Sequence, residues 1–91
     1  MPEKTATVGS SVGLHARPAA LFVQAAARQL VKVKIAKPEG DPVDARSILL
    51  VLGLDARGGE EVILSAEGEG AEQALEELAA VVATNHDAEV A

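Results

Sequence analysis

The residues best suited to chemistry lie in one short segment, Gly13-Leu14-His15-Ala16-Arg17-Pro18-Ala19. A histidine directly precedes a predicted helix start, and Pro18 falls in the first turn, where the missing proline N–H has no helical partner to lose. The first-turn N–H groups and the positive end of the helix dipole form an anion site. His15 would present a nucleophilic ring nitrogen there while Arg17 grips phosphate oxygens. The segment predicts a phosphohistidine site.

The neighbouring residues support this interpretation but leave an alternative open. Gly13 allows a tight bend before the histidine, and Ala16 contributes a first-turn backbone amide. The helix from Ala16 to Arg28 is rich in apolar residues, so a core would anchor it and hold its N-terminus rigidly. In the alternative, His15 merely caps a helix and Arg17 is an ordinary solvated side chain.

Composition restricts the class of protein. Ninety-one residues predict one domain over 1–91, with an ordered core over about 3–84 and a frayed C-terminal tail. Phe22 is the only aromatic residue, so the core must be aliphatic. There is no cysteine, and His15 and His86 lack metal-ligand spacing. We therefore expect no metal and no cofactor.

Hydropathy and charge argue against a membrane-spanning protein and a nucleic-acid-binding protein. No apolar run approaches the ~20 residues of a membrane span, and no basic-then-apolar leader opens the chain, which predicts a cytoplasmic protein without membrane insertion. The net charge is −6, with six basic residues against Glu3 alone up to residue 37 and thirteen carboxylates beyond it. The acidic half argues against nucleic-acid binding. The basic half is either ordinary surface variation or an attraction for an anionic ligand or acidic protein surface.

The periodicity of apolar residues changes type along the chain. Alternation predicts strands over 4–8, 31–35, around 43 and over 61–66, and helical spacing predicts helices over 16–28, 48–54 and 71–82. The last helix has a stripe formed by Ala71, Ala74, Leu75, Leu78 and Val82, with Glu69 and Glu72 in its first turn. Strands with one polar face need cover on one side only. The result is a two-layer α+β domain with an antiparallel sheet.

The short helix over 48–54 carries a second functional clue. Ser47 is a natural N-cap and Gly53 is suited to end the helix. The apolar positions fall on two opposite faces, with Leu50 and Leu54 on one and Ile48, Leu49 and Leu52 on the other. Two turns lying on a sheet cannot bury both faces, so one apolar cluster should remain exposed for docking. The alternative is a fully buried helix.

Together, the histidine motif and the segment from Ser47 to Leu54, followed by Gly58-Gly59-Glu60-Glu61, resemble the HPr family, the histidine-containing phosphocarriers of the bacterial sugar phosphotransferase system. The likeness runs through roughly 4–84. It implies an open-faced β-sandwich, in which three helices cover one face of a four-stranded antiparallel sheet.

The resemblance implies a relay. Enzyme I, charged by phosphoenolpyruvate, passes a phosphoryl group to His15, which passes it to the IIA domain of a sugar permease. The family uses the Nδ1 nitrogen, whereas the sequence chemistry itself does not choose between the two. Imidazole, with an ordinary pKa of about 6.5, is unprotonated and able to attack near neutrality. A shuttle that meets its partners in turn is expected to be monomeric, with Ile48, Leu49, Leu52 and Phe22 as docking residues.

Ser47 matches the position that a dedicated kinase phosphorylates in some members, and a phosphatase would reverse the modification. Those relatives often have lysine before the serine and methionines after it, where this chain has Arg46, Leu49 and Leu52. We therefore expect an N-cap first and a regulatory site second. Two rival functions remain: a non-catalytic ligand-binding module, and a phosphocarrier paralogue serving nitrogen regulation.

Overall fold

The structure is a computed structural model that describes residues 2–11 and 13–84. The elements follow the predicted order: β1 (Glu3–Thr7), α1 (Ala16–Ala27), β2 (Val33–Ala36), β3 (Val43–Asp44), α2 (Ile48–Gly53), β4 (Glu61–Ala66) and α3 (Ala71–Ala83). The predicted frayed tail lies outside the described residues.

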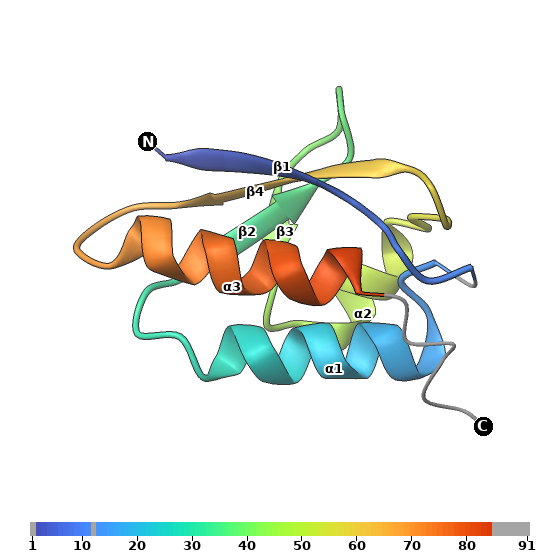
Figure 1. Cartoon of the computed structure of the whole chain (residues 1–91), viewed down its shortest axis with the longest axis horizontal. Coiled ribbons are helices and arrows are strands. Elements are labelled where there is room, and N and C mark those ends of the chain that lie inside the picture. The colour runs from blue at the N-terminus through green and yellow to red at the C-terminus, as the bar shows by residue number, and fades with distance from the viewer. Residues whose placement is uncertain (1, 12, 85–91) are drawn as a thin grey trace.

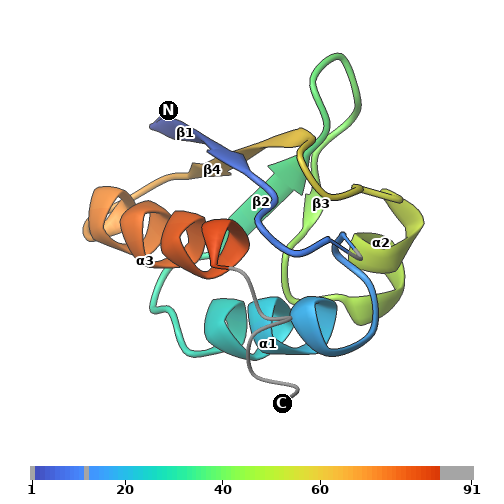
Figure 2. The ribbon, with the colours of Figure 1, turned by 45° about the vertical axis from the view of Figure 1, so that its right-hand side comes forward.

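The four strands form one antiparallel sheet in the order β1-β4-β2-β3. The register pairs Thr7 with Glu61 and Ile35 with both Leu64 and Val43. Figure 1 shows the sheet as one layer, with α1 and α3 side by side below it and α2 at one end. Turned by 45°, the same layers remain separate in Figure 2, with the turn between β2 and β3 projecting away from the helices. The predicted one-sided α+β architecture is confirmed.

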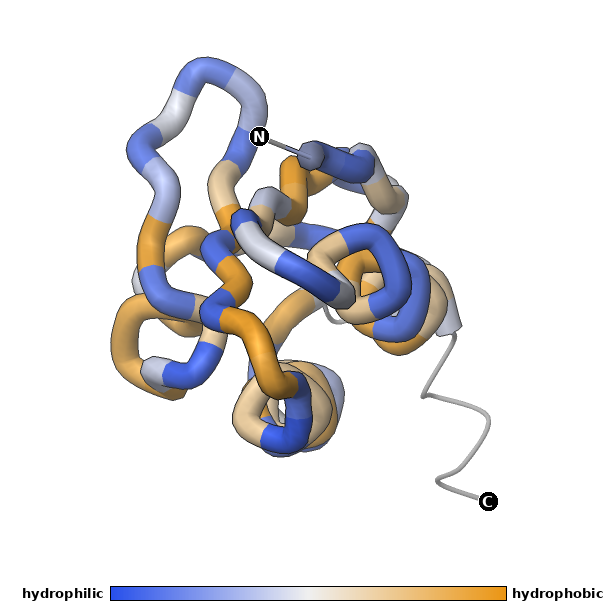
Figure 3. Tube along the Cα trace, turned by 90° about the vertical axis from the view of Figure 1, so that its left-hand side faces the viewer, coloured by the Kyte–Doolittle hydropathy of each residue, from blue (hydrophilic) through white to orange (hydrophobic). Residues whose placement is uncertain are grey.

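The core lies between the sheet and the helices and is aliphatic, as predicted, apart from Phe22. The five stripe residues predicted for α3 are all buried. Figure 3 shows hydrophobic and hydrophilic positions alternating around both long helices, while the β2–β3 turn is hydrophilic. Phe22 has no exposed surface. The prediction that Phe22 docks partners is therefore wrong, because its ring fills the space beneath the sheet.

The short helix α2 is oriented differently from the prediction. Val51 is buried, and Leu52 and Leu54 pack against the core. The exposed apolar residues are Ile48 at 39%, Leu49 at 78% and Leu50 at 47%. An exposed apolar cluster is present as expected, but Leu50 belongs to it and Leu52 does not. The prediction treated two opposite faces as alternatives, whereas α2 packs its C-terminal half inward and leaves its first turn exposed.

The ends of two helices also differ from their predicted positions. Gly53 is the last residue of α2, and the left-handed backbone that turns the chain lies at Asp55, with φ 52°. Helix α3 begins after Gly70, so Glu69 precedes it and only Glu72 lies in the first turn. Asp tolerates the left-handed region because its short side chain can bond locally.

Two loops are held together by direct backbone contact at the end of the molecule where α1 begins. The Leu14 N–H donates to the Ala56 carbonyl at 2.8 Å, and the Gly59 N–H donates to the Val8 carbonyl at 2.9 Å. A Cβ on Gly13 would lie 2.3 Å from the Ala56 oxygen, and one on Gly58 would lie 2.5 Å from the Ser10 oxygen. Gly13 also has φ +77°, which confirms the predicted tight bend. The chain from 8 to 14 is therefore seated on the chain from 56 to 59.

This contact predicts unequal costs for glycine replacement. Gly59→Ala meets the left-handed penalty of about 1–2 kcal/mol, because φ is +87° but no atom lies within 4 Å. Gly13→Ala adds a collision with backbone and should lower the free energy of unfolding by about 1 kcal/mol or more beyond that value. Urea unfolding followed by circular dichroism measures both.

Gly53→Ala supplies the control with the opposite sign. Gly53 is helical and has an ordinary φ, and a Cβ added there would meet no atom within 4 Å. Alanine at this position should therefore stabilise the protein by about 0.5–1 kcal/mol. Equal destabilisation by Gly13→Ala and Gly59→Ala would show that the loops are not in close contact.

Candidate functional site

His15 is the N-cap residue of α1, and its backbone is extended, with φ −131° and ψ 162°. Its carbonyl accepts from the Ala19 N–H at 3.5 Å, at the start of the helical ladder. Its imidazole makes no capping hydrogen bond to the helix. The Nε2 atom instead lies 3.2 Å from a carboxylate oxygen of Asp55, and the side chain is 39% exposed. The ring is thus held at one edge and accessible to solvent.

The other residues of the predicted motif surround the start of α1. Ala16 is its first residue, and the structure describes its backbone only. Arg17 is the second helical residue and is exposed, whereas Pro18 is the third and is buried. An α-helix leaves the N–H groups of its first turn without carbonyl partners four residues back. The exposed arginine and this helix end lie next to the histidine in the chain, as the motif requires.

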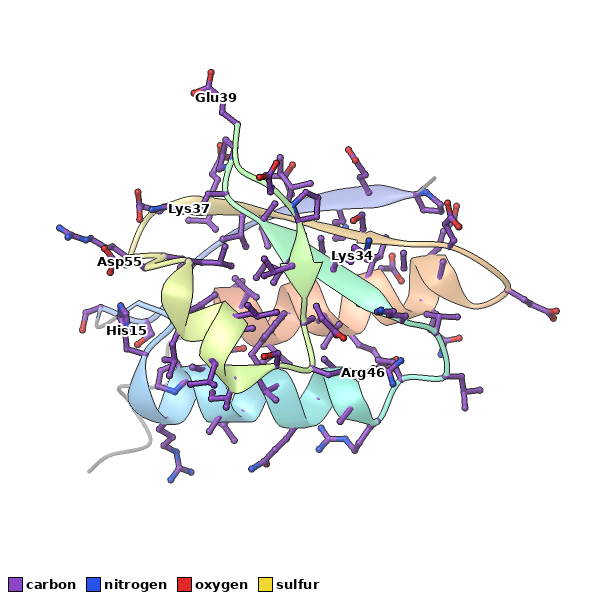
Figure 4. The ribbon with its side chains drawn as sticks, turned by 180° about the vertical axis from the view of Figure 1, so that it is seen from behind. His15, Lys34, Lys37, Glu39, Arg46 and Asp55 are labelled. Atoms are coloured by element: carbon purple, nitrogen blue, oxygen red, sulfur yellow. The ribbon has the colours of Figure 1, made fainter. Side chains whose placement is uncertain are left out.

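A cluster of charged side chains that sequence reasoning did not find lies beside His15. The second carboxylate oxygen of Asp55 lies 3.4 Å from Nη2 of Arg57. The Lys37 ammonium donates to the Asp55 backbone carbonyl at 3.3 Å and pairs with Glu60 at 3.4 Å. Figure 4 shows His15 and Asp55 close together at one end of the molecule, with Lys37 beyond Asp55 and Glu39 farther away, at the tip of the β2–β3 turn.

Both carboxylates of the cluster are held in their ionised forms. The positive charge of Arg57, followed by the hydrogen bond with His15, lowers the pKa of Asp55 below its ordinary value. A hydrogen bond from the Arg57 backbone N–H, at 2.7 Å, is the main reason that the pKa of Glu60 is also lowered. Asp55 therefore carries a full negative charge at neutral pH.

The geometry distinguishes the two ring nitrogens, which the sequence alone did not. A carboxylate only accepts hydrogen bonds, so the nitrogen facing Asp55 must carry a proton. In a neutral imidazole the other nitrogen then holds a lone pair. The arrangement leaves this lone pair on Nδ1, on a partly exposed ring beside a helix N-terminus.

The signal for Asp55 was present in the chain but weak. Asp55 follows the predicted helix end at Gly53 and stands two residues before Arg57. Non-glycine residues with positive φ are most often Asn or Asp, so a helix-ending aspartate was a candidate for this backbone. Its pairing with a histidine 40 residues earlier depends on how the two loops meet.

Two other searches cover the described part of the chain. No helix there is long and apolar enough to cross a membrane. Among the same residues, no group of three or more histidine, aspartate and glutamate side chains could hold a metal ion.

Comparison with known proteins gives a consistent result. A family model described as "PTS HPr component phosphorylation site" matches residues 2–84. The chain is 57% identical over 83 residues to the phosphocarrier protein HPr of Streptomyces coelicolor, covering 91% of this chain and 89% of the relative.

Solved structures agree. The crystal structure of a phosphocarrier protein HPr from Bacillus anthracis superposes with a TM-score of 0.83 at 43% identity, covering 89% of this chain and 95% of that one. That of an HPr dimer from Thermoanaerobacter tengcongensis gives 0.67 at 41% identity, covering 77% and 79%.

These matches span nearly the whole described chain and support a phosphocarrier of the sugar system over both rival functions. The family also accounts for the phosphoryl-transfer partners, which are enzyme I and the IIA domains. The chain belongs to the HPr family and is a non-catalytic phosphoryl carrier of the phosphoenolpyruvate-dependent sugar phosphotransferase system.

Proposed function

We propose that His15 is the residue that carries the phosphoryl group and that Nδ1 is the accepting atom. The single observation that supports this most strongly is the 3.2 Å approach of Nε2 to the Asp55 carboxylate, which leaves the lone pair on Nδ1. The Nδ1 lone pair attacks phosphorus while the donor's bond to phosphorus breaks and its electrons leave with the donor. The ring keeps its Nε2 proton and becomes cationic, which makes it a good leaving group in the next transfer.

The start of α1 and Arg17 stabilise the charge on the transferred group. The backbone amide of Ala16 and the positive end of the helix dipole favour an anion at this position. Arg17 is exposed on the first turn and offers a planar guanidinium suited to phosphate oxygens. Because a carrier must release its phosphoryl group, solvent-exposed contacts serve better than a closed pocket.

Replacing the acceptor tests this assignment. His15→Ala should abolish labelling of the chain by radioactive phosphoenolpyruvate plus enzyme I, while circular dichroism and urea unfolding remain close to those of the unmodified protein, because the ring is a partly exposed N-cap residue. In the protein that retains His15, the phosphoryl label should be lost in acid and retained in alkali, as expected for the P–N bond of a phosphoramidate. Label retained by His15→Ala would place the phosphoryl group on another residue.

The exposed apolar surface of α2, formed by Ile48, Leu49 and Leu50, supplies the docking surface for both partners. Exposed apolar clusters mark interaction sites, and Figure 1 shows α2, which carries this one, at the end of the molecule where α1 begins. Of the docking residues expected from the sequence, Leu52 packs against the core and Phe22 is buried, and Leu50 joins Ile48 and Leu49 on the exposed surface. Both partners must reach His15, so they use this surface in turn.

A matched pair of leucines tests the docking surface. Leu49→Ser should raise the KM for phosphorylation by enzyme I about fivefold, since truncating a central apolar contact costs about 1 kcal/mol. Leu30 is completely exposed but follows the far end of α1, so Leu30→Ser should leave KM within about twofold. Equal effects of the two substitutions would remove α2 from the docking surface.

Ser47 acts first as an N-cap and second as a regulatory site. Its hydroxyl accepts from the Leu50 N–H at 3.3 Å, and its side chain is half-buried. A phosphate at this helix start would not unfold the protein, but its charge would stand beside Ile48 and Leu49 and oppose docking. Arg46 is exposed next to it (Figure 4).

Mass spectrometry decides whether Ser47 is a substrate. After incubation with an HPr serine kinase and ATP, a single added phosphate should map to Ser47, and the phosphatase should remove it. The modified protein should then accept phosphate from enzyme I more slowly. An HPr that the kinase is known to phosphorylate serves as the positive control. If that control is modified and this chain is not, Ser47 acts only as an N-cap.

The remaining assignments concern the working state of the protein. The relay begins with phosphoenolpyruvate, a metabolite of the cell interior, which supports a cytoplasmic location. Two partners that reach His15 through one surface are best served by a monomer. Sedimentation analysis at working concentration tests this, and a dimer that covers α2 would contradict it.

A further inference from the structure

Asp55 occupies a left-handed backbone conformation that aspartate tolerates but that glycine adopts without steric cost. Among the described residues other than glycine, only Asp55 and Glu39 have positive φ, at 52° and 68°. A left-handed conformation is strained for residues other than glycine. Ion pairs as exposed as those of Asp55 contribute little to stability. Stability alone therefore gives little reason for an aspartate at this turn.

The surroundings of Asp55 direct its carboxylate toward the histidine. One oxygen lies 3.2 Å from Nε2 of His15 and the other lies 3.4 Å from Nη2 of Arg57. Lys37 donates to the Asp55 backbone carbonyl, and the next residue, Ala56, accepts from the Leu14 N–H. The aspartate is thus attached to the same pair of loops that carries the ring.

We propose that Asp55 is a positioning residue for phosphoryl transfer: it orients the imidazole of His15, keeps the proton on Nε2, and stabilises the positive charge that the ring gains when Nδ1 bonds to phosphorus. This inference rests on the proposed role of His15 as acceptor.

The chemistry of the step defines what the carboxylate contributes. Before transfer, the hydrogen bond from Nε2 to Asp55 favours the tautomer with an available Nδ1 lone pair. During transfer the P–Nδ1 bond forms, the donor takes the electrons of the broken bond, and the ring becomes cationic with its Nε2 proton in place. The carboxylate then faces a positive ring, so its attraction is greater after bond formation than before. A buried aspartate acts in this way on the histidine of a serine-protease triad.

Arg57 offsets the repulsion that the Asp55 carboxylate would otherwise exert on the incoming phosphoryl group. Its guanidinium balances the charge of Asp55, so the pair presents no net charge at longer range. The carboxylate keeps its effect on the ring because that contact is direct. Lys37 and Glu60 form a second balanced pair at 3.4 Å on the same side.

Two substitutions remove the carboxylate without straining the turn, because Gly and Asn both adopt positive φ. Asp55→Gly deletes the side chain. Asp55→Asn keeps its shape but removes the charge and can offer an N–H to the ring. The matched control is Glu39→Gly, which also removes a carboxylate from a left-handed position but lies at the remote tip of the β2–β3 turn (Figure 4).

The first measurement is the tautomer of His15, read from the ¹⁵N chemical shifts of the unphosphorylated ring at a pH where it is neutral. The unmodified protein and Glu39→Gly should show an unprotonated Nδ1 and a protonated Nε2. Asp55→Gly should move both shifts toward those of a solvated imidazole. The second measurement is the transfer rate from phosphorylated enzyme I, which should fall about two- to fivefold in both Asp55 variants and remain unchanged in Glu39→Gly.

Unchanged ring shifts in Asp55→Gly would overturn the proposal whatever the rate, because the aspartate would then not act through the ring. An unchanged rate with altered shifts would overturn it as well. The shift result does not depend on the acceptor assignment, since the shifts are measured before phosphorylation. Failure of the assignment itself appears separately, as label retained by His15→Ala.

Discussion

The structure depends on the backbone contact between the loop that carries His15 and the loop that follows α2. Gly13 lies against the Ala56 carbonyl and Gly58 lies against the Ser10 carbonyl, both too close for a side chain. Hydrogen bonds from Leu14 and Gly59 lock the same two segments. The position of the histidine is therefore set by peptide groups rather than by the packing of its own ring. This leaves the ring free to face solvent without losing its place.

The loop contact also brings together residues from separate elements. Helix α1 contributes its N-terminus and Arg17, and the chain after α2 contributes Asp55 and Arg57. Lys37, which follows β2, donates a hydrogen bond to the Asp55 backbone carbonyl and forms an ion pair with the Glu60 side chain. Lys37 belongs to the basic N-terminal part of the chain and its partners to the acidic remainder. At this end of the molecule, the uneven charge distribution is partly balanced by pairing.

The fold and the histidine motif were predictable because they depend on local patterns. Alternation of apolar residues predicted the β4 strand with its correct bounds. Helical spacing predicted a stripe of five residues on α3, and all five are buried. Phe22, Leu52 and Asp55 were not predictable for a common physical reason. The side of α2 that packs inward, the direction of the Phe22 ring and the partner of Asp55 are all decided by contacts with chain segments distant in sequence. Periodicity reports that an apolar face exists, but several apolar faces on a short helix compete for one core.

The exposure of the site follows from the work of a carrier. An enzyme gains by enclosing its transition state in a dry pocket, where each charge interaction is stronger. A carrier that held its phosphoryl group in such a pocket would slow the second transfer by as much as it favoured the first. Here His15 and Asp55 are 39% and 56% exposed, so solvent weakens every contact with the phosphorylated ring. The low-dielectric surroundings needed for rapid transfer must then come from whichever partner covers the site, and they depart with that partner when transfer is complete.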